Sequence, residues 1–434
     1  MRTKGKRRPP IDEDAALLPG EEVRFDTDEG TKLVSHEVLN ERYIRGDVRI
    51  VTESARYPLT GILEMLEALD PEDPSGKEKR YKLDPEYQRR HRWSKERKSR
   101  LIESFLMNIP VPPVFLYERD LARFEVMDGR QRLTALRDFY ANKFALEGLE
   151  YWPELNGMYY SKPPMLPSKI KDGIDRRYIS SIVLLKETAR NEEEAARLKK
   201  IVFERLNSGG VELSQQESRN AAYDGPLNRL CLDLSENLMF RRMWRIPEHP
   251  TPTEDDEGDY EAGADEESAG HEMFKRMDDV ELVLRFFAYR QLEAFTGGLN
   301  KISSFLDLFL VQGNKFEKKL LKDYRQMFEQ TISFLWTMLG VDTFCRLDRE
   351  GKPQARSRPT KIVYDPLMLV ASRYARKVDL TTQAGQSARL RKQLGAMYED
   401  DASLFAGRRT NRSDALRRNE RMVEAFGSVF GQER

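Results

Sequence analysis

The sequence is poor in cysteine and histidine, and this scarcity excludes several kinds of site. Among 434 residues there are two cysteines, Cys231 and Cys345, which cannot build a disulfide framework or a cysteine zinc site. There are four histidines, and none of them lies beyond His271. We therefore expect the chemistry of this chain to rely on carboxylates, amides and guanidinium groups.

Long apolar runs and several familiar enzyme motifs are also missing. No apolar run approaches the roughly 18 residues that a membrane helix needs. The N-terminal segment is basic but has no apolar core, so it does not resemble a secretory signal. Neither G-x-x-x-x-G-K-[ST], H-E-x-x-H nor G-x-S-x-G occurs, which argues against a P-loop NTPase, a zincin and an α/β-hydrolase. These absences favour a cytoplasmic protein with no membrane association.

Charge is balanced over the whole chain but unevenly distributed along it. Lys plus Arg and Asp plus Glu number 73 each. Residues 77–100 contain eleven Lys or Arg against four acids, whereas residues 248–272 contain eleven acids and no Lys or Arg. The basic segment is compatible with nucleic acid or nucleotide binding, and equally with a solvated helix face.

The hydrophobic pattern predicts a mixed first half and a helical second half. We expect residues 1–30 to be a disordered tail, followed by a mixed domain over 31–225. Ser214 and Glu217 form a capping box at the start of a helix in that domain. After it we expect a helical connection (226–247), an acidic linker or loop (248–272) and a helical domain (273–434). In the mixed domain we expect helices at 58–69, 94–107, 130–142 and 192–206, and strands at 114–117, 124–127 and 178–185.

The segment Glu125–Leu136 is the strongest functional signal. An apolar strand is followed by the tight turn Asp128-Gly129, and a helix begins at Arg130. The first amide groups of a helix and its dipole suit an anion such as phosphate. Arg130, Gln131 and Arg132 could bind phosphate, and Asp128 could hold a metal ion or orient water. The alternative is an ordinary Asp-Gly turn whose arginines pair with nearby carboxylates.

Two other segments carry residues suited to a nucleotide. Upstream, Gln88, Arg89 and Arg92 could bind phosphate, and Tyr87 or Trp93 could stack on a base. The alternative is a basic loop whose aromatic residues anchor it to the core. Downstream, three further candidates lie just before the helix that Ser214 caps. The alternative is that the two glycines among them only allow a backbone turn with positive φ. These residues are Asn207, Gly209 and Gly210.

Together these segments resemble the ParB-like N-terminal domain of Gmr-type, modification-dependent restriction enzymes. The resemblance covers roughly residues 50–225. It implies a ParB/sulfiredoxin-like α+β domain with a nucleotide site, followed here by an all-α region. Arg130 replaces a family glutamine and cannot accept a hydrogen bond, so it could bind phosphate but not position water through an acceptor. The motifs are Q-R-x-x-x-W (Gln88–Trp93), I-P-x-P-P (Ile109–Pro113), D-G-x-Q-R-L (Asp128–Leu133) and F-x-x-x-N-x-G-G-x-x-L-S-x-x-E (Phe203–Glu217).

The resemblance implies a nucleotide-binding, NTP-hydrolysing subunit of a bacterial DNA-restriction or anti-phage system. Its cofactors would be a nucleoside triphosphate and Mg²⁺, with Asp128 as the metal ligand and Asp128, Gln131 and Arg132 as catalytic residues. Family members often carry a C-terminal HNH nuclease, which needs histidine. Because no histidine follows His271, we expect DNA as a partner and a nuclease or other effector acting in trans. The alternatives are a non-catalytic DNA-binding or scaffold protein, and a DNase acting through the ParB-like domain. Nucleotide-contacting residues would be Gln88, Arg89, Arg92, Gly129, Arg130, Asn207, Gly209 and Gly210.

Overall fold

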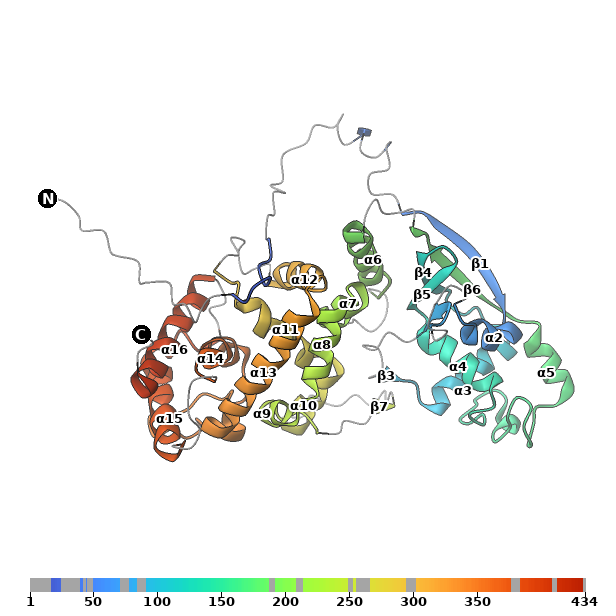
Figure 1. The fold of residues 1–434 in the computed structure, drawn as a ribbon. Coiled ribbons are helices and arrows are strands. Elements are labelled where there is room, and N and C mark those ends of the chain that lie inside the picture. The colour runs from blue at the N-terminus through green and yellow to red at the C-terminus, as the bar shows by residue number, and fades with distance from the viewer. Residues whose placement is uncertain are drawn as a thin grey trace. The chain divides into compact units, whose positions relative to one another are not determined.

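The chain divides into two compact units in a computed structural model (Figure 1). The first, here called the sheet unit, comprises residues 31–222 and 251–262. The second, the helical unit, comprises residues 1–30, 223–250 and 263–434. The structure describes residues 17–24, 40–41, 44, 50–70, 78–83, 91–186, 192–207, 214–248, 253–254, 266–293, 302–375, 383–407 and 412–431.

A five-stranded mixed sheet forms the centre of the sheet unit. Its order is β1-β6-β4-β5-β2. The β4–β5 and β1–β6 pairs are antiparallel, whereas β4 pairs with β6, and β2 with β5, in parallel. The strands are β1 (Thr52–Pro58), β2 (Tyr81–Lys82), β4 (Val114–Asp120), β5 (Arg123–Asp128) and β6 (Tyr178–Leu184).

Helices pack beside this sheet because its strands alternate in polarity. Phe124 and Val126 of β5 face the apolar core that also contains residues of α2, α3 and α4. Figure 1 shows these three helices gathered together next to the sheet. Glu125 points to the opposite face, since successive strand residues alternate, and there it meets α6. The helices are α2 (Ile62–Glu67), α3 (Lys95–Leu106), α4 (Arg130–Tyr140), α5 (Ser168–Asp175), α6 (Glu192–Asn207) and α7 (Gln215–Ala222).

Two predicted helix starts are confirmed by their capping bonds. The Ser94 side chain accepts a hydrogen bond from the Arg97 amide at the start of α3, at 3.2 Å. At the start of α7, the Ser214 hydroxyl accepts from the Glu217 amide, and the Glu217 carboxylate accepts from the Ser214 amide. This reciprocal pair is the predicted capping box.

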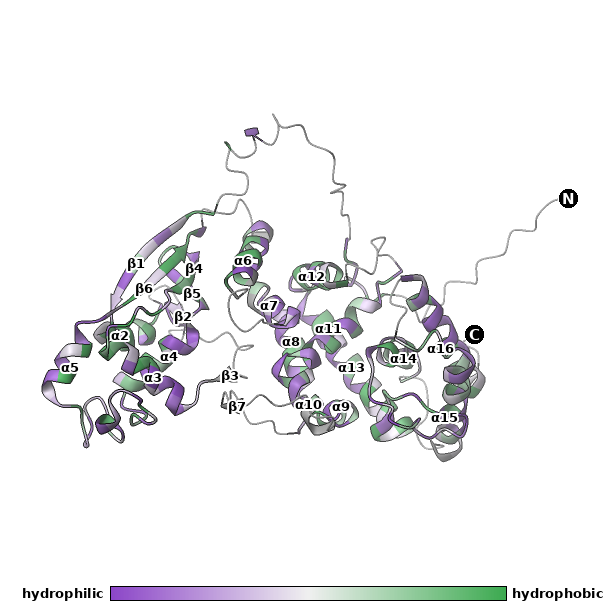
Figure 2. Cartoon of the chain, turned by 180° about the vertical axis from the view of Figure 1, so that it is seen from behind, coloured by the Kyte–Doolittle hydropathy of each residue, from purple (hydrophilic) through white to green (hydrophobic). Residues whose placement is uncertain are grey.

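The helical unit is built around aromatic side chains. Phe287 of α11 and Tyr324 of α13 stack with ring centroids 4.3 Å apart, and Phe328 packs edge-on against Phe286. Figure 2 shows hydrophobic and hydrophilic residues alternating along α13 and α16, as expected of amphipathic helices. The helices are α8 (Pro226–Ser235), α9 (Leu238–Trp244), α10 (Glu266–Lys275), α11 (Asp278–Tyr289), α12 (Ile302–Gly313), α13 (Lys318–Leu339), α14 (Lys361–Tyr374), α15 (Gln383–Asp400) and α16 (Arg412–Phe430).

Three segments differ from the sequence-based expectation. Residues 17–24, expected in a disordered tail, pack in the helical unit, where Glu21 is fully buried against Arg290. Within the expected acidic linker, Thr253–Glu254 form β7, which pairs with β3 (His91–Arg92), and α10 begins at Glu266. The expected helix at 58–69 begins only after β1 and a short 3₁₀ turn, because the chain up to Pro58 pairs with β6. Residues 1–16 and 25–30 of the expected tail lie outside the described residues.

The described residues thus combine a five-stranded sheet with many helices, a mixed architecture compatible with the α+β class. Helices dominate from residue 266 onward, where we find one isolated bridge, Leu347 with Pro353. Over the described part of the chain, no helix is both long and apolar enough to cross a membrane.

Candidate functional site

The strand–turn–helix junction predicted at Asp128 is present in the sheet unit. β5 ends at Asp128, and α4 begins at Arg130. Gly129 joins them with φ of 89°, in the left-handed region that favours glycine. A Cβ atom at Gly129 would also lie 2.5 Å from Cγ1 of Val114, on the neighbouring strand β4. Glycine is therefore required here both by its backbone angle and by close packing.

The N-terminus of α4 is suited to an anion. No side chain caps it, and its first turn contains no acidic residue. Arg130 and Gln131 lie in that first turn and are both partly buried. An uncapped helix start attracts negative charge through its amide groups and its dipole. The junction can therefore bind a phosphate or a similar anion.

Arg132 ties the junction to the proline-rich segment that precedes β4. Its Nη2 donates to Oδ2 of Asp128 at 2.6 Å. Its Nη1 donates to the carbonyl oxygens of Pro112 and, at 3.2 Å, Pro113. The Arg132 side chain is only 11% exposed, so one buried guanidinium joins three acceptors. In this arrangement Arg132 serves chiefly to position Asp128.

Asp128 keeps one carboxylate oxygen available for a ligand. Its side chain is 37% exposed, and Oδ2 carries the bond to Arg132. No hydrogen bond to Oδ1 is found from the residues that the structure describes. A single, half-exposed carboxylate beside an anion-binding helix start is a donor set that fits Mg²⁺ bound mainly through a substrate's phosphates.

The other carboxylates near the junction already have partners. Both Glu125 oxygens accept from Nζ of Lys199 on α6, at 2.7 and 2.8 Å, in a mostly buried pair. Glu217 caps α7. Where side chains are described, no group of three or more His, Cys, Asp or Glu is arranged to hold a metal ion. Sequence reasoning missed the Glu125–Lys199 pair, since nothing local signals that Lys199 faces β5.

Gln131 links the junction to the upstream motif. Its Oε1 accepts from the backbone amide of Trp93, at 3.3 Å. The Trp93 ring is partly buried against the core, and the Arg97 guanidinium lies over it, 5.0 Å from the ring centroid. One face of the Trp93 ring is therefore covered by Arg97.

The remaining candidate residues are described only in part. The backbone of Arg92 lies in β3, and that of Asn207 at the end of α6, but their side chains are outside the described set. Sequence reasoning did not foresee that β3 pairs with β7, because the two are far apart in the chain. Gln88, Arg89, Gly209 and Gly210 lie outside the described residues altogether.

Three polar residues form a buried cluster on α7, at the end of the downstream motif and just beyond it. Gln216, Arg219 and Asn220 are each 1% exposed or less. The Gln216 amide donates to Oδ1 of Asn220 at 2.7 Å, and Arg219 donates to Oε1 of Gln216. Buried polar groups must be paired in this way. These residues therefore have a structural role in holding α7.

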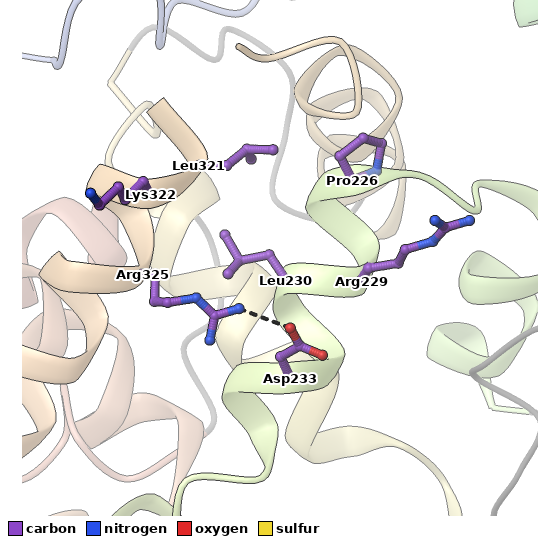
Figure 3. A pocket seen from close by; sticks show the side chains of 7 residues that line it. All are labelled: Pro226, Arg229, Leu230, Asp233, Leu321, Lys322 and Arg325. Carbon is purple, nitrogen blue, oxygen red and sulfur yellow. Dashed lines mark hydrogen bonds and ion pairs between the residues drawn. The ribbon is translucent and has the colours of Figure 1, made fainter. Parts of the chain in front are cut away.

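The surface hollow shown in Figure 3 lies in the helical unit, between α8 and α13, and includes none of the predicted site residues. Arg325 pairs with Asp233 across it at 2.8 Å, and Arg229 pairs with Asp224. Both of these arginines are therefore paired with carboxylates, and Lys322 is the third cation of the lining. Its lining residues are Pro226, Arg229, Leu230, Asp233, Leu321, Lys322 and Arg325.

Fold and site together define a mixed α/β protein with a strand–turn–helix junction at Asp128-Gly129. Residues 75–223 match the family model of the GmrSD restriction endonuclease N-terminal domain. The resemblance predicted from the sequence is thus confirmed over this range, which runs from before β2 to the end of α7 and includes the junction. The match suggests a protein of a restriction system. No curated protein and no solved structure matches the chain.

Proposed function

We propose that this chain is a nucleotide-binding, NTP-hydrolysing subunit of a DNA-restriction system, with a ParB-like nucleotide unit. The observation that carries the proposal is the left-handed Gly129 turn, which places the uncapped start of α4 next to the carboxylate of Asp128. Its position inside the range matched to a restriction-endonuclease domain supports the assignment.

The proposed roles follow from the geometry of the junction. The first amides of α4 and the Arg130 side chain would bind phosphate oxygens, and Asp128 would hold Mg²⁺ or orient the attacking water. Arg132 positions Asp128 through the 2.6 Å bond. Phosphoryl transfer needs mainly positioning and charge stabilisation, which this set of groups provides.

The segments flanking the junction would complete the nucleotide site. Gln131, whose oxygen accepts from the Trp93 amide, would help to position the substrate. Gln88, Arg89 and Arg92 are proposed to add charge and hydrogen bonds upstream. The downstream contacts would come from Asn207, Gly209 and Gly210.

The test is phosphate release from four nucleoside triphosphates with Mg²⁺, with and without DNA, for the wild type and for Asp128→Asn. We expect hydrolysis to fall by about a hundredfold or more in the variant, as for loss of a group that orients a proton or water. Binding of a fluorescent nucleotide should persist, since the helix start is unchanged. Asp120→Asn is the matched control, because Asp120 is an exposed carboxylate on the neighbouring strand that pairs with Lys186. Equal turnover in both variants would refute the role of Asp128.

A non-catalytic DNA-binding or scaffold role is the second candidate. It is favoured by the Asp128–Arg132 pair, because a carboxylate that already has an internal partner needs no metal. In that case, nucleotide would neither bind nor turn over, and DNA affinity would fall steeply with salt concentration. In either case, we propose that a nuclease or another effector protein acts together with this chain, in trans.

A further inference from the structure

The segment Leu17–Arg24 is held in the helical unit by side chains that form hydrogen bonds with its backbone. The Gln291 side chain accepts from the Val23 amide at 2.8 Å and donates to the Glu21 carbonyl at 2.6 Å. Gln312 does the same for a single residue, accepting from the amide of Arg24 and donating to its carbonyl. Two glutamines thus take the place that a neighbouring strand would have in a sheet.

The same segment contributes one buried charge. The Glu21 side chain is fully buried, and both its oxygens accept from Arg290, at 2.5 and 3.0 Å. A paired guanidinium and carboxylate provide geometric specificity as well as attraction. Because an unpaired buried charge is costly, the site selects a carboxylate at this position.

The segment is extended and alternates in exposure. Glu21 and Val23 are buried, whereas Glu22 and Arg24 are exposed, the two-residue period of a strand. The turn before it is preorganised, with Pro19 followed by Gly20 at φ of 82° and a hydrogen bond from the Glu21 amide to the Leu18 carbonyl. Such a turn lowers the entropy lost when the segment docks.

We propose that Arg290, Gln291 and Gln312 form a docking site for an extended acidic peptide, and that its occupant is the segment Leu17–Arg24 of the same chain. The site requires a carboxylate at the Glu21 position, a small apolar side chain at the Val23 position and an extended backbone.

The experiment uses the full chain with a specific protease site inserted at residues 26–29, cut after folding. We expect the N-terminal fragment to remain bound on size-exclusion chromatography of the cut, monomeric protein. A fluorescent peptide of residues 15–26 should then exchange into the site once the fragment is competed away. The Glu21→Gln peptide should bind at least about tenfold more weakly, because it removes one partner of a buried charge pair.

The matched control is the Glu22→Gln peptide, which loses the same charge at an exposed position and should bind like the wild type. Because both changes lie in the peptide, neither affects the folding of the protein. Equal binding of the two variants, or release of the wild-type fragment on cutting, would overturn the proposal. A dimer that separates only when the chain is cut would overturn the assignment of the occupant to the same chain.

Discussion

Substituting Gly129 by alanine tests the packing of the candidate site. Alanine at a φ of 89° costs about 1–2 kcal/mol, because its Cβ approaches the following carbonyl in the left-handed region. The new Cβ would also lie 2.5 Å from Cγ1 of Val114, a core side chain that is 1% exposed. Overpacking of this kind adds about 1–3 kcal/mol. We therefore expect Gly129→Ala to destabilise the sheet unit by about 2–5 kcal/mol.

Gly157→Ala separates the two contributions to this cost. Gly157 has φ of 84°, and a Cβ there would meet nothing within 4 Å. Gly157→Ala should therefore lower the stability only by the cost of the left-handed backbone angle, about 1–2 kcal/mol. The loss of unfolded-chain entropy on replacing glycine is the same in both variants, so it cancels in the comparison.

Hydrogen exchange over residues 114–140 is the assay, because a chain of two units does not unfold in one transition. The free energy of opening should fall more in Gly129→Ala than in Gly157→Ala. In the double variant Gly129→Ala/Val114→Ala, the clash at this contact is removed. The loss of stability in the double variant should therefore differ from the sum of the two single losses by about 1–3 kcal/mol. If Gly129→Ala costs no more than Gly157→Ala, the close approach of the turn to β4 is not a constraint.

Three further predictions concern charged groups in the same unit. Lys199→Met should cost about 3–5 kcal/mol in urea unfolding of the sheet unit, since Glu125 is left buried without its partner, and adding Glu125→Gln should restore much of it. Burial alone would raise the pKa of Asp138, but hydrogen bonds and charges from Lys98 and a neighbouring arginine outweigh it and lower that pKa. Asp138 therefore stabilises the fold above its unfolded pKa of about 3.9, and this stabilisation is lost as the pH falls through the lower pKa of the folded state. In an acid titration of stability, the Asp138→Asn variant should not show this loss. Arg132→Lys should raise hydrogen exchange at the amides of Val111 and Val114, because lysine cannot reach three acceptors in a fork, and unchanged exchange would exclude the positioning role.

Local sequence signals predicted most elements of the sheet unit to within a few residues. The strand pair at 114–117 and 124–127 is present as β4 and β5, and the helix expected from Arg130 is α4. These signals work because capping residues, turns and apolar periodicity act over one or two turns of chain. Local signals wrongly predicted disorder for residues 17–24, because they do not report on contacts with distant parts of the chain. The packing of these residues depends on Arg290, which pairs with Glu21 from more than 260 residues away in the chain.

The candidate site was predicted in part for the same reason. Asp128, Gly129 and the start of α4 are consecutive, so their arrangement follows from local conformation. The partners of the site are not local. Arg132 reaches back to Pro112 and Pro113, and Gln131 to Trp93, contacts that exist only once β4 and β5 have paired.

The amino-acid sequence by itself determined most strands and helices of the sheet unit, the glycine turn before α4, and the family that the range 75–223 resembles. Each of these rests on neighbouring residues and their intrinsic preferences. Only the tertiary structure decided which charged side chains are paired inside the protein. Glu125 is neutralised by Lys199, because folding brings β5 and α6 together and removes the water that would otherwise solvate these charges. Asp128 and Arg132 are only four residues apart, but the tertiary structure adds the bonds from Arg132 to the carbonyl oxygens of Pro112 and Pro113.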